Sequence, residues 1–149
     1  MANPNNPLTT RAKAMGLTMV FDRELIPSTR RAHQAAEYAR SKGKFDPFHH
    51  SVLERYWTKG ENLHEWSVLR AAAADAGLDG DALQREVESG AWKPVMEAGL
   101  AAASELGVHA VPTFIVGNKF VIQGAQESQV FAHAFERLGF GPRSKTPGP

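Results

Sequence analysis

The clearest structural signal lies between residues 107 and 122, which read Gly107-Val108-His109-Ala110-Val111-Pro112-Thr113-Phe114-Ile115-Val116-Gly117-Asn118-Lys119-Phe120-Val121-Ile122. Two β-rich runs flank a two-residue Gly-Asn link, which favours a tight β-hairpin because both turn residues need positive φ. Pro112 cannot donate a ladder hydrogen bond, and it stands at the first position of a strand, where proline is tolerated. The sequence therefore predicts a hairpin that is entered through a proline loop.

The sequence on either side of the hairpin is helical in pattern. Apolar residues recur at three- and four-residue spacing, and Gly43, Gly60, Gly77, Gly90 and Gly107 follow the ends of the periodic segments. We expect helices over residues 9–15, 28–40, 46–59, 65–76, 80–89, 91–106 and 127–138. Asp46-Pro47 is expected to open one of them as N-cap and first helical residue, and Asp79 is expected to cap another.

Only one early segment, Leu17 to Phe21, has β-like composition. It offers a short third strand at most, whereas a lone hairpin is marginally stable in water. Both hairpin runs are apolar with little alternation, so both faces of the small sheet need cover and one edge is left unpaired. We expect a homodimer, or a partner that supplies strands, to complete the sheet. The alternative is a three-stranded sheet whose edge is covered by the chain's own helices.

Composition excludes several classes of function. The chain has 149 residues, a formal net charge of +1 and no cysteine. The charge gives no electrostatic case for nucleic acid or an anionic membrane, and no apolar run approaches the ~20 residues of a membrane span. Residues 1–7 contain no apolar signal core, which predicts a cytoplasmic location. Because the chain has no cysteine, it can have no structural disulfide, no thiolate metal site and no thiolate nucleophile.

The hairpin segment and the Gly124-Ala125-Gln126 turn that follows it are similar to the C-terminal half of the DsbA-like oxidoreductases, particularly their FrnE-type branch. The resemblance continues upstream and covers residues 8–138. It includes Ile26-Pro27-Ser28-Thr29-Arg30-Arg31-Ala32, Ala36-Glu37-Tyr38-Ala39, Gly43-Lys44-Phe45 and Ala76-Gly77-Leu78-Asp79, which look like the family's inserted helical domain.

This resemblance implies an α+β, helix-rich, partial thioredoxin-like fold. Residues 1–8 would be a disordered lead-in and residues 141–149 a disordered tail. Residues 9–140 would form a truncated DsbA-like domain, with a helical subdomain over about 28–106 and the proline loop, hairpin and final helix over 107–139. Family members begin with a strand, a helix bearing Cys-x-x-Cys or Ser, and a second strand, and nothing in this sequence matches that unit.

The resemblance also implies a site. In the family a cis-proline loop faces a low-pKa thiolate and helps to position substrate, which carries over to Val111, Pro112 and Thr113 as substrate-binding residues, with a cis Val111–Pro112 bond. No catalytic residue, metal ligand or cofactor carries over. We therefore expect a protein of disulfide-oxidoreductase ancestry with a non-catalytic role in binding a peptide or glutathione-like ligand, or in assembly.

Two alternatives stay open. One is a glutathione-dependent isomerase or transferase related to the 2-hydroxychromene-2-carboxylate isomerases, which resemble this fold but use Ser and bound glutathione. The other is that a separate chain encodes the missing strand–helix–strand unit. Whether the chain is an enzyme is left undecided by the sequence.

Other residue clusters have simpler explanations. Adjacent His49 and His50 point to different sides of a helix, and we expect them to be solvated or capping rather than metal-ligating with His64. His109 is expected to be an exposed loop residue, and Arg30-Arg31 a solvated first turn rather than an anion site. Trp57, Trp66 and Trp92 stand at helical positions and are expected to pack the helical bundle.

Overall fold

The computed structural model describes residues 7–21 and 26–141 and divides into two compact units. The first runs to Leu100 and is helical; the second begins at Ala101 and contains the hairpin, so the division falls inside one helix. We call them the helical unit and the C-terminal unit. The predicted lead-in lies outside the described residues up to residue 6, and the predicted tail lies outside them from residue 142.

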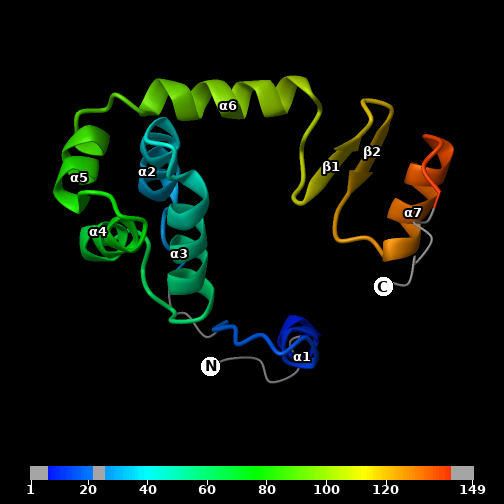
Figure 1. Ribbon diagram of the computed structural model, residues 1–149, viewed down its shortest axis with the longest axis horizontal. Helices are drawn as coiled ribbons and strands as arrows, with labels where there is room; N and C mark the ends of the chain where they lie inside the picture. Colours follow the sequence, from blue (N-terminus) through cyan, green and yellow to red (C-terminus); the bar gives the residue numbers. More distant parts are fainter. Residues whose placement is uncertain (1–6, 22–25, 142–149) are drawn as a thin grey trace, which may run out of the picture. The chain divides into compact units, whose positions relative to one another are not determined.

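The helical unit contains α1 (Pro7–Ala14), α2 (Arg30–Ser41), α3 (Phe45–Trp57), α4 (Trp66–Asp75), α5 (Gly80–Glu88) and the first part of α6 (Lys93–Glu105). Helices α2 to α5 pack together (Figure 1) around Phe48, Leu69 and Leu83, which are fully buried. Alanines 35, 39, 72 and 73 are also fully buried, and their small side chains let the helix backbones approach closely. The predicted helices are confirmed, with ends shifted by up to two residues; α1, for example, begins at Pro7.

The start of α3 differs from the prediction. The helix begins at Phe45 with Lys44 as N-cap, so Asp46 lies in the first turn instead of capping it. Gly43 has φ +68° and ends α2, and the Lys44 amide already donates to the Ala39 carbonyl at 2.8 Å. The Phe45 ring lies 3.7 Å beneath the Arg40 guanidinium. Phe45 is thus in contact with α2 at the point where α3 begins.

The predicted third strand is wrong for the described residues: Leu17 to Phe21 has no strand pairing. The segment instead packs on the C-terminal end of α3. The Val20 amide donates to the Trp57 carbonyl at 2.6 Å, and the Phe21 and Trp57 rings lie 5.9 Å apart. The Trp57 carbonyl lies in the last turn of α3, where helix carbonyls lack a donor within the helix, and it therefore accepts from the Val20 amide, which would otherwise donate to a neighbouring strand.

The C-terminal unit contains β1 (Thr113–Val116), β2 (Phe120–Gln123) and α7 (Ser128–Arg137). The strands pair antiparallel, with Thr113 opposite Gln123 and Val116 opposite Phe120. Three residues therefore form the loop, where the sequence predicted two. Gly117 and Asn118 have φ of +59° and +52°, as the prediction required, and the Lys119 amide donates to the Val116 carbonyl at 3.2 Å.

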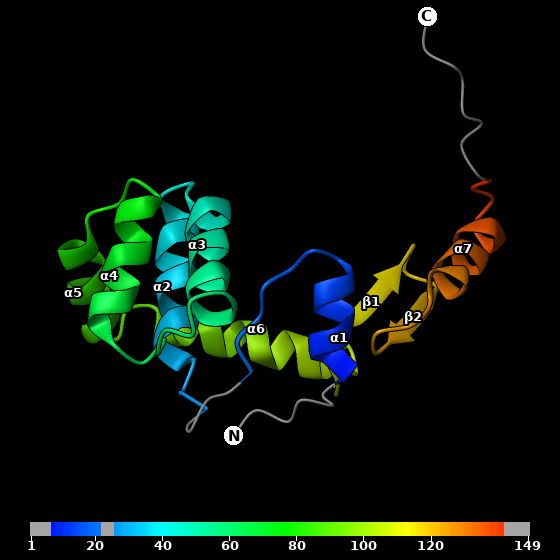
Figure 2. The ribbon, with the colours of Figure 1, turned by 90° about the horizontal axis from the view of Figure 1, so that it is seen from below.

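Helix α7 covers one face of the hairpin (Figures 1 and 2). Phe114 meets Phe131 edge-on at 4.9 Å, Ile122 is buried, and the Arg137 guanidinium lies 5.2 Å from the Phe120 ring. On the opposite face, the cross-strand pair Ile115 and Val121 is 42% and 58% exposed. The fold is thus helix-rich with a small antiparallel sheet that is covered on one face within its unit.

Candidate functional site

The proline loop connects α6 to β1. The Gly107 and Val108 amides close the end of α6 by donating to the Ser104 and Ala103 carbonyls. The Val111–Pro112 peptide bond is cis, and the Val111 side chain is 89% exposed. The three residues predicted as substrate-binding, Val111 to Thr113, are contiguous here, with Pro112 also exposed and Thr113 half-buried.

Two hydrogen bonds fix this loop to the hairpin. The Thr113 hydroxyl donates to the Ala110 carbonyl at 2.6 Å, which closes the loop on itself. The Gly124 amide donates to the Pro112 carbonyl at 2.7 Å, which continues the β1–β2 ladder by one pair. The cis peptide bond is thus fixed on its strand side, while the Val111 side chain stays accessible.

The outer edge of β1 is unpaired among the residues that the structure describes. Hydrogen-bonded and non-hydrogen-bonded pairs alternate in an antiparallel ladder, and Pro112 faces Gly124 in a hydrogen-bonded pair. The backbone groups of Phe114 therefore point toward β2, whereas those of Thr113 and Ile115 point away from it. This gives an extended polypeptide a row of donors and acceptors directly after the proline loop.

Arg31, Trp66 and Trp92, also candidates from the sequence, are used in packing. Trp66 lies 4.9 Å beneath the Arg31 guanidinium, which also donates to the His64 carbonyl at 2.8 Å. Trp92 meets Tyr38 edge-on at 5.8 Å. Trp66 and Trp92 both pack against the helical core, as predicted. Arg31 therefore braces α2 against the loop before α4.

The histidines do not assemble into a ligand set. His49 stacks on Phe45 at 5.1 Å, and His50 and His109 are exposed. Across residues 7–21 and 26–141, no three His, Cys, Asp or Glu side chains come together in a way that could hold a metal ion.

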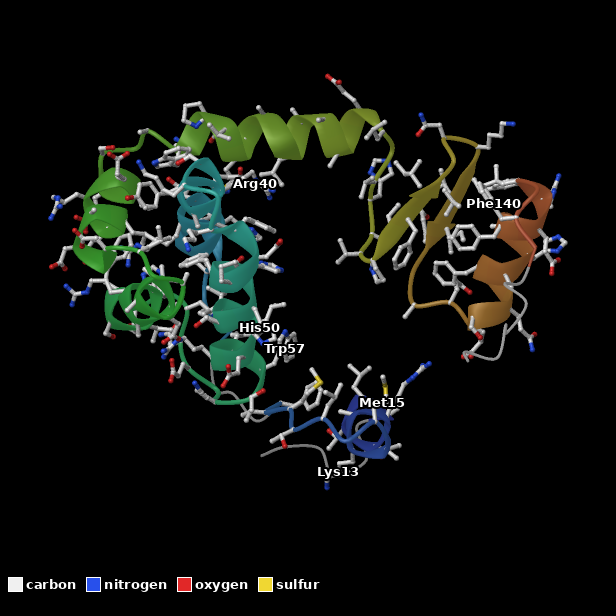
Figure 3. The ribbon with its side chains drawn as sticks, viewed as in Figure 1. Lys13, Met15, Arg40, His50, Trp57 and Phe140 are labelled. Carbon is white, nitrogen blue, oxygen red and sulfur yellow. The ribbon has the colours of Figure 1, made fainter. Side chains whose placement is uncertain are left out.

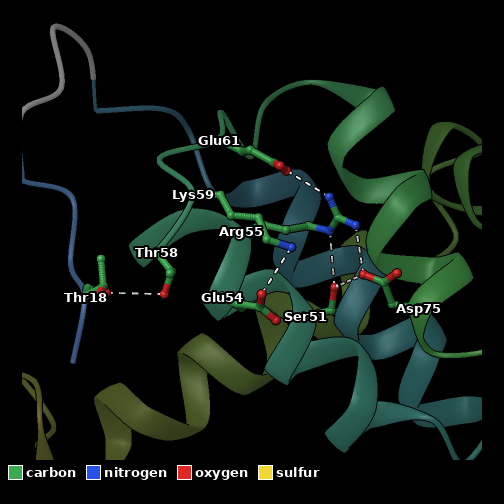
Figure 4. Close-up of polar contacts among 8 residues, drawn as sticks. All are labelled: Thr18, Ser51, Glu54, Arg55, Thr58, Lys59, Glu61 and Asp75. Atoms are coloured by element: carbon green, nitrogen blue, oxygen red, sulfur yellow. Dashed lines mark hydrogen bonds and ion pairs between the residues drawn. The ribbon is translucent and has the colours of Figure 1, made fainter. Parts of the chain in front are cut away.

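A polar cluster between α3 and α4 was not predicted from the sequence (Figure 4). The Ser51 hydroxyl and the Arg55 Nη2 both reach Asp75 Oδ2, at 2.7 and 2.8 Å, and Arg55 Nη1 reaches Glu61 at 3.0 Å. Hydrogen bonds from Ser51 and Arg55 lower the pKa of Asp75. Burial disfavours the charged form of Arg55, but its hydrogen bonds to Asp75 and Glu61 outweigh that cost and raise its pKa.

This cluster is structural rather than catalytic in chemistry. The Ser51 hydroxyl donates a hydrogen bond to a carboxylate that is already ion-paired with Arg55, and no imidazole of the described residues hydrogen-bonds to the cluster. The local spacing of Ser51 and Arg55, four residues apart on one helix, was the signal in the sequence. Their partner on α4 could not be identified without the packing of the two helices.

Comparison with known proteins decides the family. The DSBA-like thioredoxin domain matches residues 5–136 of this chain. The chain belongs to the DsbA-like thioredoxin family. The predicted family is thereby confirmed, and the absence of cysteine means that this member carries no Cys-x-x-Cys pair within the 149 residues.

Three curated relatives of this DsbA-like chain match over part of their length. The uncharacterized protein YwbO of Bacillus subtilis is 29% identical over 72% of the chain and 54% of its own length. The ClpXP adapter protein SpxH of Shouchella clausii is 28% identical over 67% of the chain and 36% of its own length. A 2-hydroxychromene-2-carboxylate isomerase of Sphingobium xenophagum is 32% identical over 57% of the chain and 44% of its own length.

A solved structure agrees on the fold. The crystal structure of a probable DsbA oxidoreductase from Streptomyces coelicolor superposes with a TM-score of 0.74 at 23% identity, covering 93% of this chain and 60% of that one. The chain therefore spans about a third to three fifths of the length of these relatives. Among the described helices, none is both long and apolar enough to cross a membrane.

Proposed function

We propose that this DsbA-like chain binds an extended polypeptide at the Val111–Pro112 loop and the edge of β1, and that it does not exchange disulfides unaided. The exposed loop beside an unpaired strand edge supports the binding role. Extended peptides add to such edges through main-chain hydrogen bonds, while side-chain contacts set the selectivity. Val111 would contact the side chains of the bound segment, and Thr113 and Ile115 would pair with its backbone.

The lack of exchange activity follows from chemistry. Thiol–disulfide exchange requires a thiolate to attack a disulfide sulfur, and this chain has no cysteine. A thiolate from elsewhere would have to be supplied. We expect no acceleration of insulin reduction by dithiothreitol, measured by turbidity, when the pure chain is added. Robust acceleration by the cysteine-free protein would contradict the proposal.

Peptide binding is tested separately by ¹H–¹⁵N correlation spectra. The probe is insulin B chain with its thiols blocked by iodoacetamide, so that only non-covalent binding is observed. We expect saturable shifts confined to the amides of residues 108–111 and 113–115. Val111→Asp should remove them, whereas Leu17→Asp, at a 51% exposed position in the helical unit, should not. Shifts spread over both units, or binding unaffected by Val111→Asp, would count against the site.

We also propose that the sheet is completed by association, either with a second copy or with a partner chain that supplies strands. The exposed Ile115–Val121 pair on the sheet's second face supports this, because a two-stranded sheet is marginal alone. Light scattering of the pure chain should report a dimer that Val121→Lys weakens. A monomer at high concentration would exclude self-association and leave the partner chain.

The second candidate function is that of a glutathione-dependent isomerase or transferase. The similarity to a 2-hydroxychromene-2-carboxylate isomerase, 32% identical over 85 residues, favours it. Glutathione should then raise the melting temperature with saturation, since a ligand that binds only the folded state stabilises it. No shift at millimolar glutathione would remove this candidate for the chain by itself.

The FrnE branch and cytoplasmic location remain predictions.

A further inference from the structure

Two hollows adjoin on the surface of α2 in the helical unit, and Thr29 and His33 line both of them. The first lies between α2 and α3 and encloses about 220 Å³. The second lies between α2 and α6 and encloses about 370 Å³. We call them the aromatic hollow and the polar hollow. Neither contains a residue of the proline loop, so they form a location separate from the proposed peptide site.

The aromatic hollow is built from apolar side chains of two helices that are held by the core. Its walls include Phe48 and Val52, which are buried, and Tyr56 and Trp57, which are partly buried. Leu53, 43% exposed, stands at its rim. Trp57 sits at the C-terminal end of α3 (Figure 3). A closed cavity of roughly 150 Å³ holds benzene, so this hollow has room for one or two fused rings, with one side open to solvent.

The polar hollow has a different chemistry. Arg30, His33 and Glu37 line it beside Val95, Met96 and Leu100. The Glu37 carboxylate is paired with Arg40 at 3.2 Å, whereas Arg30 forms no ion pair with any described residue. A cationic group therefore stands next to an apolar, ring-sized cavity, and His33 separates the two.

We propose that the helical unit binds a small aromatic carboxylate, with its rings in the aromatic hollow and its carboxylate beside Arg30 and His33. Apolar burial supplies the affinity, and the guanidinium selects the anion. This inference does not depend on peptide binding at Val111–Pro112. It also does not depend on glutathione, whose body is polar and does not match the aromatic hollow.

The test uses two probes of equal ring size and different charge, 2-naphthoate and 2-naphthol, titrated by calorimetry into the full chain. We expect both to bind at one site, with naphthoate about two- to fivefold tighter, the value of an exposed ion pair. Arg30→Gln should abolish that preference and leave naphthol binding unchanged. Equal affinities of the two probes for the wild-type chain would overturn the role of Arg30.

Two variants locate the rings. Leu53→Asp at the rim should weaken both probes by about tenfold or more, the cost of placing a carboxylate against a buried apolar group. Leu106→Asp, 63% exposed on the C-terminal unit, is the matched control and should bind like wild type. Because Leu53 is partly exposed, the variant is expected to keep its helical circular dichroism. If it does not, Leu53→Trp, which fills the hollow, serves the same purpose.

Three results would overturn the proposal. These are no saturable binding of either probe, binding that survives both Leu53 variants, and a hollow occupied by a second copy. Occupation by a second copy is detected by light scattering. It would show a dimer that dissociates in the Leu53→Asp variant and also on addition of the probes. Failure here would leave the proline-loop experiments unaffected, because those are read at residues 108–115 of the other unit.

Discussion

The helical unit encloses large apolar side chains between its helices, whereas among the described residues of the C-terminal unit only Ile122 and Ala134 are buried apolar residues. Phe48, Leu69 and Leu83 are fully buried between helices, but Val111 and Val121 are 89% and 58% exposed. Helices satisfy their own backbone groups, so they can bury one face against each other and be complete. A two-stranded sheet cannot complete itself in this way, because the outer edges of its strands stay unpaired and one of its faces stays uncovered. The C-terminal unit therefore leaves one face of its sheet and the outer edge of β1 uncovered among its own described residues.

The largest expected effect lies in the helical core. Phe48→Ala should lower the free energy of unfolding of the helical unit by about 3–5 kcal/mol, through lost burial and the cavity left behind. Urea unfolding followed by helical circular dichroism measures it. The matched variant Phe140→Ala, 64% exposed in the C-terminal unit, should change it by less than about 0.5 kcal/mol. Similar losses for the two would erase the contrast between the units.

The hairpin turn gives the next effect. Gly117 has φ +59°, and a Cβ there would lie 2.8 Å from Leu138 Cδ1. Gly117→Ala should destabilise the C-terminal unit by about 1–2 kcal/mol from the backbone alone, with a further loss if Leu138 moves. Hydrogen exchange of amides 113–123 reports it. Gly43→Ala has the same sign of φ but no atom within 4 Å, so it isolates the backbone cost in the other unit.

Acid should weaken the helical unit before it affects the hairpin. The pKa of Asp75 is lowered by Ser51 and Arg55, and that of Asp79 by the amides of Ala82 and Asp81, both from an ordinary value of 3.8. The unfolded chain thus binds more protons, so these carboxylates contribute stability above about pH 4 that is lost as pH falls through their folded pKa values. The free energy of unfolding should fall less between pH 4 and pH 2 in an Asp75→Asn/Asp79→Asn variant than in the wild type. The same pH dependence in both proteins would contradict this.

The smallest effect is expected on the uncovered face of the sheet. Val121→Lys should alter the stability of the isolated chain by no more than about 0.5 kcal/mol, because the side chain is already mostly in water. Differential scanning calorimetry at low protein concentration checks this. The same substitution on the covered face, Ile122→Lys, buries a charge and should be far more damaging. If both are tolerated, α7 does not cover the hairpin in solution.

Local sequence signals predicted most of the elements, and tertiary contacts explain the failures. Asp79 caps α5 as expected, since the cap needs only the amides of Asp81 and Ala82, two and three residues further on. The strand expected at Leu17 to Phe21 failed because the carbonyl at the end of α3 took the Val20 amide, a partner that lies far away in the sequence. The hairpin loop is one residue longer than predicted because Val116 pairs with Phe120 rather than with Lys119.

The candidate site divides in the same way. The proline loop could be found because its residues are contiguous, and its geometry follows from hydrogen bonds between residues at most 12 apart in the sequence, Thr113 to Ala110 and Gly124 to Pro112. The Arg55 cluster and the two hollows could not, since each is made by side chains from different helices. Only the packing of α2 on α3 brings Phe48 and Trp57 beside Thr29 and His33.

The contact of Val20 and Phe21 with Trp57 gives this protein an internal optical reporter. The Trp57 carbonyl accepts a hydrogen bond from the Val20 amide, and the Trp57 indole contacts the Phe21 ring. The surroundings of the indole therefore change when this segment leaves. Detachment of the N-terminal segment would therefore alter tryptophan emission while the helical core remained folded, and small openings well below the global transition could be timed without attaching a dye.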